Sequence, residues 1–111
     1  MQTPKLDIVQ HPASNGTLVA RLSGKLSLET VTGFLQETRS IAAEAMVLDM
    51  SGVTFLDSAG VGALVQLFVH RRNHSKKLAV AALTTQGMAV MQVAGLTKLL
   101  PTFATVEEAA A

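Results

Sequence analysis

One stretch of the sequence, residues 46–69, constrains the fold more than any other part of the chain. It begins with an apolar run at residues 46–50, which is typical of a short buried strand. Ser51 and Gly52 follow as turn-forming residues. Further on, apolar residues recur at the i, i+3, i+4 and i+7 spacing of an amphipathic helix: Val61, Leu64, Val65 and Phe68. We therefore predict a strand, a loop and a helix that ends at about Asn73.

Asp57 and Ser58 lie where this loop enters the helix. At that place a short oxygen-bearing side chain accepts hydrogen bonds from the unpaired N–H groups of the first helical turn. The simplest interpretation is that one of the two residues is the N-cap, which stabilises a helix by about 1 kcal/mol.

The residues around Asp57 and Ser58 also resemble a known signature. Residues 54–64, Thr-Phe-Leu-Asp-Ser-Ala-Gly-Val-Gly-Ala-Leu, closely resemble the motif of anti-sigma-factor antagonists, the founding members of the STAS domain family. Two further segments, residues 21–26 and 93–96, match the same family at compatible spacing. The resemblance covers about residues 6–108 and implies a single STAS domain over residues 1–111.

In that family the serine directly after the motif aspartate is phosphorylated by a partner kinase, and the corresponding residue here is Ser58. The resemblance thus implies a bacterial regulator of transcription that binds a kinase-type anti-sigma factor, a serine kinase related to ATPases. Binding would free the sigma factor, and phosphorylation of Ser58 would reverse the effect. The partner-binding residues that it implies are Asp57, Ser58, Ala59, Gly60, Val61, Gly62 and Ser27.

Two motif positions depart from the family pattern. Ser27 follows Gly24-Lys25-Leu26, where family members often carry an aspartate. Ala59 replaces a second hydroxyl that many members carry, which leaves Ser58 as the acceptor within Asp57-Ser58-Ala59.

A second role is compatible with the same resemblance. Small STAS domains also serve as accessory subunits of lipid or anion transporters, where they dock on an ATPase or a permease. A shared fold does not separate the two roles. The intact Asp57-Ser58 pair favours the switch protein.

Composition limits the remaining classes of function. A chain of 111 residues forms one domain with a sizeable core, and the absence of cysteine excludes disulfides and thiolate chemistry. The net charge of +1 argues against a general polyanion-binding protein. The apolar runs are shorter than the ~18 residues of a membrane span, so no membrane insertion is expected. Because the first residues contain no apolar segment typical of a secretory signal, we expect a cytoplasmic protein.

An enzyme is not expected. Residues 56–60, Leu-Asp-Ser-Ala-Gly, loosely resemble the Gly-x-Ser-x-Gly nucleophile elbow, but the first glycine is missing. A nucleophilic serine needs a base within about 3 Å. His70 and His74 would lie roughly 18 and 24 Å from Ser58 along the same helix. His11, in an early loop, is not excluded by its spacing.

The polar residues after residue 69 are interpreted as a solvated helix end. His70 and His74 are four residues apart, as metal ligands can be, but no carboxylate or thiol accompanies them at ligand spacing. We therefore expect no metal and no cofactor. The nearby basic residues lack aromatic neighbours on which bases could stack, which argues against a nucleic-acid site; they are Arg71, Arg72, Lys76 and Lys77.

The first part of the chain predicts a hairpin and a helix. A strand beginning at Leu6 and a second strand over residues 17–22 flank Asn15-Gly16, a strong hairpin signal, so they should be antiparallel. Residues 23–27 are predicted to form a loop, with Ser27 capping a helix that ends at about Ala43. The expected inward side chains of that helix are Val31, Phe34, Leu35, Thr38, Ile41 and Ala42.

The last part of the chain continues the alternation of strands and helices. Residues 77–83 predict a strand covered on both faces and parallel to residues 46–50. A helix over residues 86–94 should follow, capped by Thr84 or Thr85 and ended by Gly95, with Val90, Met91 and Ala94 inward. Residues 99–103 predict a weak strand, and Thr105 with Glu108 predicts the capping box of a last short helix. The pattern predicts an α/β domain with right-handed crossovers, about four or five strands in a small mixed sheet and about four helices.

The helix after Ser58 carries more apolar residues than one core stripe needs. The surplus consists of Val61, Ala63, Leu67 and Val69. We expect part of it to be exposed near the helix start, as a partner surface would be, with Met88 of the next helix as a weaker candidate for the same patch.

Overall fold

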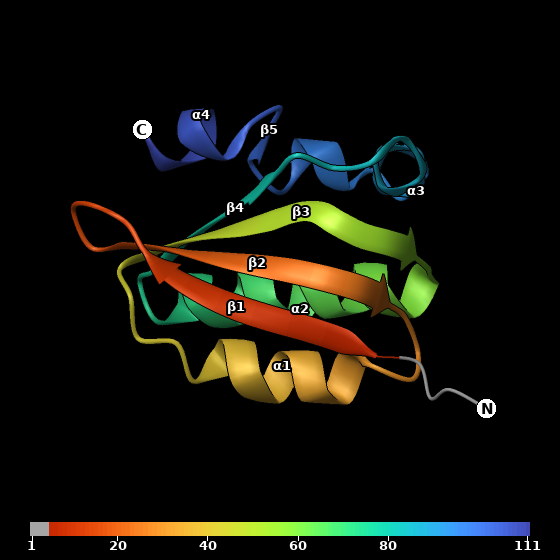
Figure 1. Cartoon of the computed structure of the whole chain (residues 1–111), viewed down its shortest axis with the longest axis horizontal. Coiled ribbons are helices and arrows are strands. Elements are labelled where there is room, and N and C mark those ends of the chain that lie inside the picture. Colours follow the sequence, from red (N-terminus) through yellow and green to blue (C-terminus); the bar gives the residue numbers. More distant parts are fainter. Residues whose placement is uncertain (1–4) are drawn as a thin grey trace.

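A mixed five-stranded sheet runs through the middle of the molecule in the computed structural model, which describes residues 5–111 (Figure 1). The strands follow one another across the sheet in chain order. β1 and β2 are antiparallel, and β2 to β5 are parallel. The strands are β1 Leu6–Pro12, β2 Thr17–Leu26, β3 Ala45–Leu56, β4 Lys77–Ala81 and β5 Thr102–Phe103. The predicted α/β fold, a hairpin followed by strand–helix alternation, is confirmed.

Four α-helices connect and cover these strands. They are α1 Val31–Arg39, α2 Ser58–Asn73, α3 Thr85–Val93 and α4 Val106–Ala110, with a 3-10 turn η1 at Leu96–Lys98. α1 lies below the strands in Figure 1, α2 lies next to α1 and behind β1 and β2, and α4 lies above the strands. None of the helices in the described part of the chain is long and apolar enough to span a bilayer.

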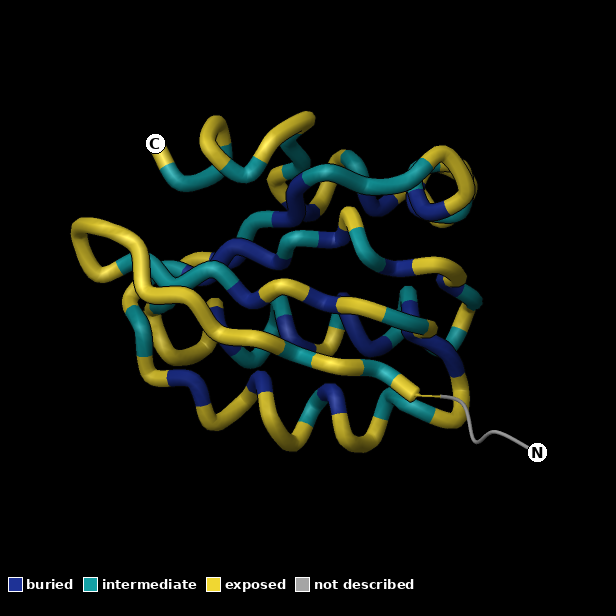
Figure 2. Tube along the Cα trace, in the orientation of Figure 1, coloured by how far each residue is buried: buried dark blue, intermediate teal, exposed yellow. Residues whose placement is uncertain are grey.

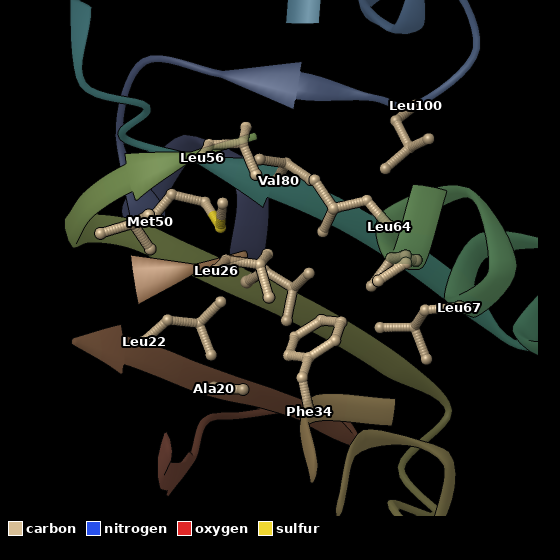
Figure 3. Packing of buried hydrophobic residues seen from close by; sticks show 14 of the residues in the cluster. Ala20, Leu22, Leu26, Phe34, Met50, Leu56, Leu64, Leu67, Val80 and Leu100 are labelled. Atoms are coloured by element: carbon tan, nitrogen blue, oxygen red, sulfur yellow. The ribbon is translucent and has the colours of Figure 1, made fainter. Parts of the chain in front are cut away.

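The core lies between the sheet and its helices. Side chains from β2, β3 and β4 meet those of α1 and α2 there, with Phe34, Leu64 and Leu67 among the most deeply buried (Figure 3). Burial is concentrated in the central strands and the inner sides of the helices, whereas β1 and its hairpin are mostly exposed (Figure 2). The expected inward residues Val31, Phe34, Leu35 and Thr38 of α1 are buried or half-buried.

The hairpin between β1 and β2 forms as predicted from Asn15-Gly16. The Thr17 N–H donates to the Ser14 carbonyl at 3.3 Å and closes a four-residue turn. Both central residues have positive φ, 60° for Asn15 and 74° for Gly16, as a type I′ turn requires.

β2 and β3 extend further than predicted. Residues 23–26, predicted as loop, belong to β2, and Ser51 and Gly52, predicted as turn, lie within β3. β3 carries an extra residue relative to β2 at two places, so the turn-forming residues are absorbed as bulges. The Asp49 carboxylate stabilises the first bulge, because one oxygen accepts from the Ser51 N–H at 3.0 Å and from the Ser51 hydroxyl at 2.7 Å.

α1 is shorter than predicted, and Ser27 does not cap it. The Ser27 side chain donates to Glu29 at 3.0 Å, while its carbonyl accepts from the N–H groups of Thr30 and Val31. Residues 27–30 therefore form a separate turn before the helix. α1 ends at Arg39, so Ile41 lies in the segment that follows the helix, where it is buried as expected. Ala42, which was expected to face inward, is exposed.

The C-terminal elements largely follow the predicted pattern. β4 is parallel to β3 but ends at Ala81. Thr84 caps α3 by accepting from the Gly87 N–H at 3.1 Å, and Gly95, with φ 74°, follows its last turn. Ala94, expected inward, is exposed.

The last strand and helix are short. β5 comprises Thr102–Phe103 rather than residues 99–103. Thr105 caps α4 by accepting from the Glu108 N–H at 3.1 Å, which is half of the predicted capping box.

The polar end of α2 was predicted to be fully solvated, but Arg71 is buried. Its side chain is only 2% exposed. It donates to the carbonyls of Lys77 at 2.8 Å, Ile41 at 3.3 Å and Ala43 at 2.6 Å. Burial lowers the pKa of Arg71, but the ordinary value lies so far above neutral pH that the guanidinium stays charged. Arg71 thus joins the end of α2 to the segment after α1 and to the start of β4.

We expect Arg71→Ala to lower the free energy of unfolding by about 3 kcal/mol or more, because three carbonyls lose a charged donor and a cavity opens. Arg72→Ala is the matched control. Arg72 is exposed and lies over the Phe68 ring at 5.7 Å, so its loss should cost under about 1 kcal/mol. Urea unfolding followed by circular dichroism measures both, and equal losses would contradict the role assigned to Arg71.

Candidate functional site

Asp57 holds the loop between β3 and α2 in place. Its backbone is extended, and one carboxylate oxygen accepts from the Gly60 N–H at 2.9 Å, so Asp57 is the N-cap of α2. The other oxygen accepts from the Leu28 N–H at 3.3 Å. One side chain therefore caps α2 and also joins it to the turn that precedes α1.

Ser58 is the first residue of α2 and is exposed. Within residues 5–111 no group forms a hydrogen bond with its hydroxyl. The positive end of the helix dipole and the first free N–H groups lie beside it, which favours an anion at this position. The hydroxyl is accessible and uncommitted.

The two glycines of the motif have different surroundings. A Cβ on Gly60 would lie 2.2 Å from the carbonyl oxygen of Leu26 and 2.7 Å from a methyl group of Leu56. The first turn of α2 therefore lies so close to the end of β2 that only glycine fits at this position. A Cβ on Gly62 would meet nothing within 4 Å.

The buried stripe of α2 is displaced by one residue from the predicted one. It consists of Gly60, Ala63, Leu64, Leu67 and Arg71. Ala63 and Leu67, counted as surplus for a partner surface, are therefore core residues, whereas Val61, Val65 and Phe68 are only half-buried. Gly60 faces β2, and residues three, four and seven positions further on face the same way.

An apolar depression lies next to Ser58, between the start of α2 and α3. It has a volume of about 360 Å³ and is lined by Ser58, Val61, Ala89, Val90, Val93 and Ala94. Val93 is 91% exposed. The expected apolar surface near the helix start is present, but α3 contributes most of it. Met88 does not line it and lies over a separate depression with Leu83 and Gln92.

The seven residues predicted to bind a partner are gathered at this end of the molecule, but two of them are covered. Ser27 is 3% exposed and Gly60 is buried, so both support the site from beneath. Ser58 is exposed, and the remaining four, Asp57, Ala59, Val61 and Gly62, are half-buried. Leu28, directly after Ser27, is 70% exposed.

Gln86 of α3 is part of the site and was not predicted. Its amide N–H donates to the Leu56 carbonyl at 2.8 Å, and its amide oxygen accepts from the Leu56 N–H at 3.1 Å. The side chain pairs with the last residue of β3 as a neighbouring strand would. The contact joins residues 30 positions apart, so no local pattern in the sequence indicates it.

His70 and His74 lie at the other end of α2. Their ring centroids are 4.4 Å apart, and Nδ1 of His74 lies 2.8 Å from the His70 carbonyl oxygen. Burial lowers the pKa of His70, and the neighbouring His74 and Arg39 lower it further. No group of three or more metal-ligating side chains occurs in the described part of the chain.

Comparison with known proteins identifies the family. The family description "STAS domain" matches residues 9–109. The chain belongs to the STAS domain family.

Solved structures share the fold of this STAS domain. An anti-sigma factor antagonist from Mycobacterium paratuberculosis is 22% identical, with a TM-score of 0.86 and coverage of 96% of this chain and 92% of that chain. SpoIIAA, an anti-sigma factor antagonist, in its unphosphorylated form, is 21% identical, with a TM-score of 0.77 and coverage of 94% and 93%. A sulfate transporter family protein from Wolinella succinogenes is 14% identical, with a TM-score of 0.78 and coverage of 89% and 85%.

The two motif glycines of the STAS domain allow a matched test of the close approach at Gly60. Gly60→Ala should lower the free energy of unfolding by about 1–3 kcal/mol, because the Leu26 carbonyl must move away. Gly62→Ala should raise it by up to about 1 kcal/mol, since alanine favours the helix and nothing obstructs its Cβ. Thermal and urea unfolding of both variants provide the measurement, and equal effects would rule out the proposed difference.

Gln86→Glu should loosen the Ser58 loop, because a carboxylate can still accept from the Leu56 N–H but repels the Leu56 carbonyl. Gln92→Glu, an exposed change on the same helix, is the control. Amide hydrogen exchange at Leu56 should become at least severalfold faster in the first variant alone. Unchanged protection at Leu56 in Gln86→Glu would show that the amide contact does not hold the loop.

Proposed function

We propose that this STAS domain is an anti-sigma factor antagonist acting in the bacterial cytoplasm. It binds a kinase-type anti-sigma factor and frees the sigma factor, and phosphorylation of Ser58 ends the interaction. The observation that carries the proposal is the exposed, uncommitted Ser58 hydroxyl at the start of α2, beside an apolar depression. The shared fold with anti-sigma factor antagonists supports it, as does the existence of SpoIIAA in a phosphorylated form.

Ser58 is suited to be a phosphoryl acceptor rather than a catalytic nucleophile. Phosphorylation forms a bond from the Ser58 oxygen to phosphorus, breaks the bond to the leaving nucleotide and transfers the hydroxyl proton to a base. The carboxylate of the preceding residue, Asp57, already accepts N–H groups on both of its oxygens. The base and the nucleotide site therefore belong to the partner kinase.

The fold should tolerate a phosphate at this position. A phosphoserine carries about −1.5 to −2 charges at pH 7. The dipole at the start of α2 favours an anion there by roughly 0.3–1 kcal/mol. The modified protein thus stays folded, and the switch acts on binding.

At an interface the same charge acts in the opposite direction. One like charge at 4 Å costs about 4 kcal/mol for an effective dielectric constant near 20. That energy corresponds to a loss of affinity of nearly a thousandfold. Asp57, directly beside Ser58, adds to the negative potential. The repulsion at the interface exceeds the dipole stabilisation, so phosphorylation releases the partner without unfolding the domain.

A role as the accessory subunit of a lipid or anion transporter is the second candidate. The likeness to the Wolinella sulfate transporter family protein, over 89% of this chain, favours it. In that role the domain would dock on a permease or a transporter ATPase, and the modification state of Ser58 would not govern binding. The two candidates thus differ in whether binding depends on Ser58.

Ser58→Asp should weaken binding to the anti-sigma kinase of the same cell by a hundredfold or more, because it places a charge in the contact. Ser58→Ala should bind as the unmodified protein does. Isothermal titration with the purified kinase measures both, and intact mass after incubation with ATP should show one added phosphoryl group in the wild type and none in Ser58→Ala.

Ser14→Asp is the control for added charge, since Ser14 is exposed in the hairpin at the other end of the strands. Circular dichroism should show the same fold for all variants. Equal affinity of Ser58→Asp and wild type for the kinase would refute the switch, and binding to a transporter subunit unaffected by Ser58→Asp would support the second candidate.

A further inference from the structure

A large cavity lies at the end of the molecule opposite Ser58. Its volume is about 640 Å³, and its walls come from the last turns of α2, the starts of β3 and β4, the hairpin between β1 and β2, β5 and the end of α4. β4 passes between α2 and α4 in Figure 1. This volume falls within the range of about 300–1,000 Å³ that is typical of small-molecule sites.

The cavity exists because β5 is short and α4 carries small side chains. β5 pairs only with Val80 and Ala81, so within residues 5–111 no strand covers the edge of β4 at residues 77–79. Ala109 and Ala110 form the wall on the α4 side and leave the space unfilled.

The lining combines apolar walls with a cationic rim. Phe68 and Phe103 are among its apolar residues, whereas its charged residues are Arg72, Lys76, Lys77 and Glu44. The one ion pair in the described part of the chain joins Lys5 and Asp7, so the three cations are not neutralised by ion pairing there. The Arg72 guanidinium lies over the Phe68 ring at 5.7 Å, where the apolar wall meets the rim.

Lysines on an exposed strand edge also protect it against pairing with other chains. That role explains Lys77, the first residue of β4. It explains neither Arg72, which belongs to α2, nor a cavity of this size.

We infer that this cavity binds an amphipathic organic anion. The apolar body of the ligand contacts Phe68 and Phe103, and its carboxylate, sulfonate or phosphate group meets Arg72 and Lys76 at the rim. The site is separated from Ser58 by nearly the length of α2, about 20 Å. The inference therefore does not depend on the proposed function.

A pair of matched probes tests both halves of the inference. The anionic probe is 8-anilinonaphthalene-1-sulfonate, and the neutral one is N-phenyl-1-naphthylamine, which has the same rings without the sulfonate. We expect saturable binding of the anion, with a Kd on the order of 10–100 micromolar, and binding of the neutral probe at least severalfold weaker. In a nuclear magnetic resonance titration the amide shifts should occur at Ala79 and Ala109, not at Val61 and Val93.

Variants identify the groups involved. Arg72→Gln and Lys76→Gln should each lower the affinity for the anionic probe by about three- to tenfold and leave the affinity for the neutral probe unchanged. Lys98→Gln, outside the cavity, is the charge control. Ala110→Leu should fill part of the cavity and lower the affinity for both probes. Circular dichroism should confirm that this variant remains folded.

Equal affinity for the two probes would overturn the inference. So would shifts confined to the depression beside Ser58, or affinities that respond equally to Lys98→Gln and Arg72→Gln. These results leave the proposed function untouched, because none of the variants changes the Ser58 end of the molecule.

Discussion

The close approach of α2 to the end of β2 at Gly60 governs the arrangement of the site. The glycine lets the first helical turn lie against the Leu26 carbonyl, and this contact sets the rotation of the helix about its axis. Ala63, Leu64 and Leu67 consequently face the core, and Val61 stays half-exposed beside Ser58. The same constraint thus builds the core under α2 and leaves an apolar surface next to the hydroxyl.

Side chains that bind backbone groups hold the two ends of α2. At the start, Asp57 bonds to its own helix and to the turn before α1, and Gln86 bonds to both backbone groups of Leu56. At the end, Arg71 provides three donors to carbonyls of two other segments. Buried or constrained backbone groups need such partners, since an unpaired one costs about 1–3 kcal/mol. Ser58 is therefore displayed on a structure that is fixed from several directions.

This arrangement suits a switch that acts through charge. The dipole at the helix start favours an anion, whereas a partner surface in contact with a phosphorylated Ser58 would meet a new negative charge beside Asp57. The cavity near Arg72 lies at the other end of α2, so a ligand there and a partner at Ser58 would not compete for the same surface. The two candidate sites lie at opposite ends of α2.

The sequence alone predicted the order of strands and helices, the hairpin at Asn15-Gly16, the cap at Thr105 and the position of Ser58 at a helix start, and it limited the cap of α3 to Thr84 or Thr85. These features depend on side-chain periodicity and on backbone preferences of a few consecutive residues, which the sequence expresses directly. The burial of Arg71, the part played by Gln86, the bulges of β3 and the rotation of α2 could be seen only in the three-dimensional structure. Each of these depends on a contact with a distant segment. A hydrogen bond between residues 30 positions apart leaves no local pattern, because the residue that makes it would look the same on an exposed helix face.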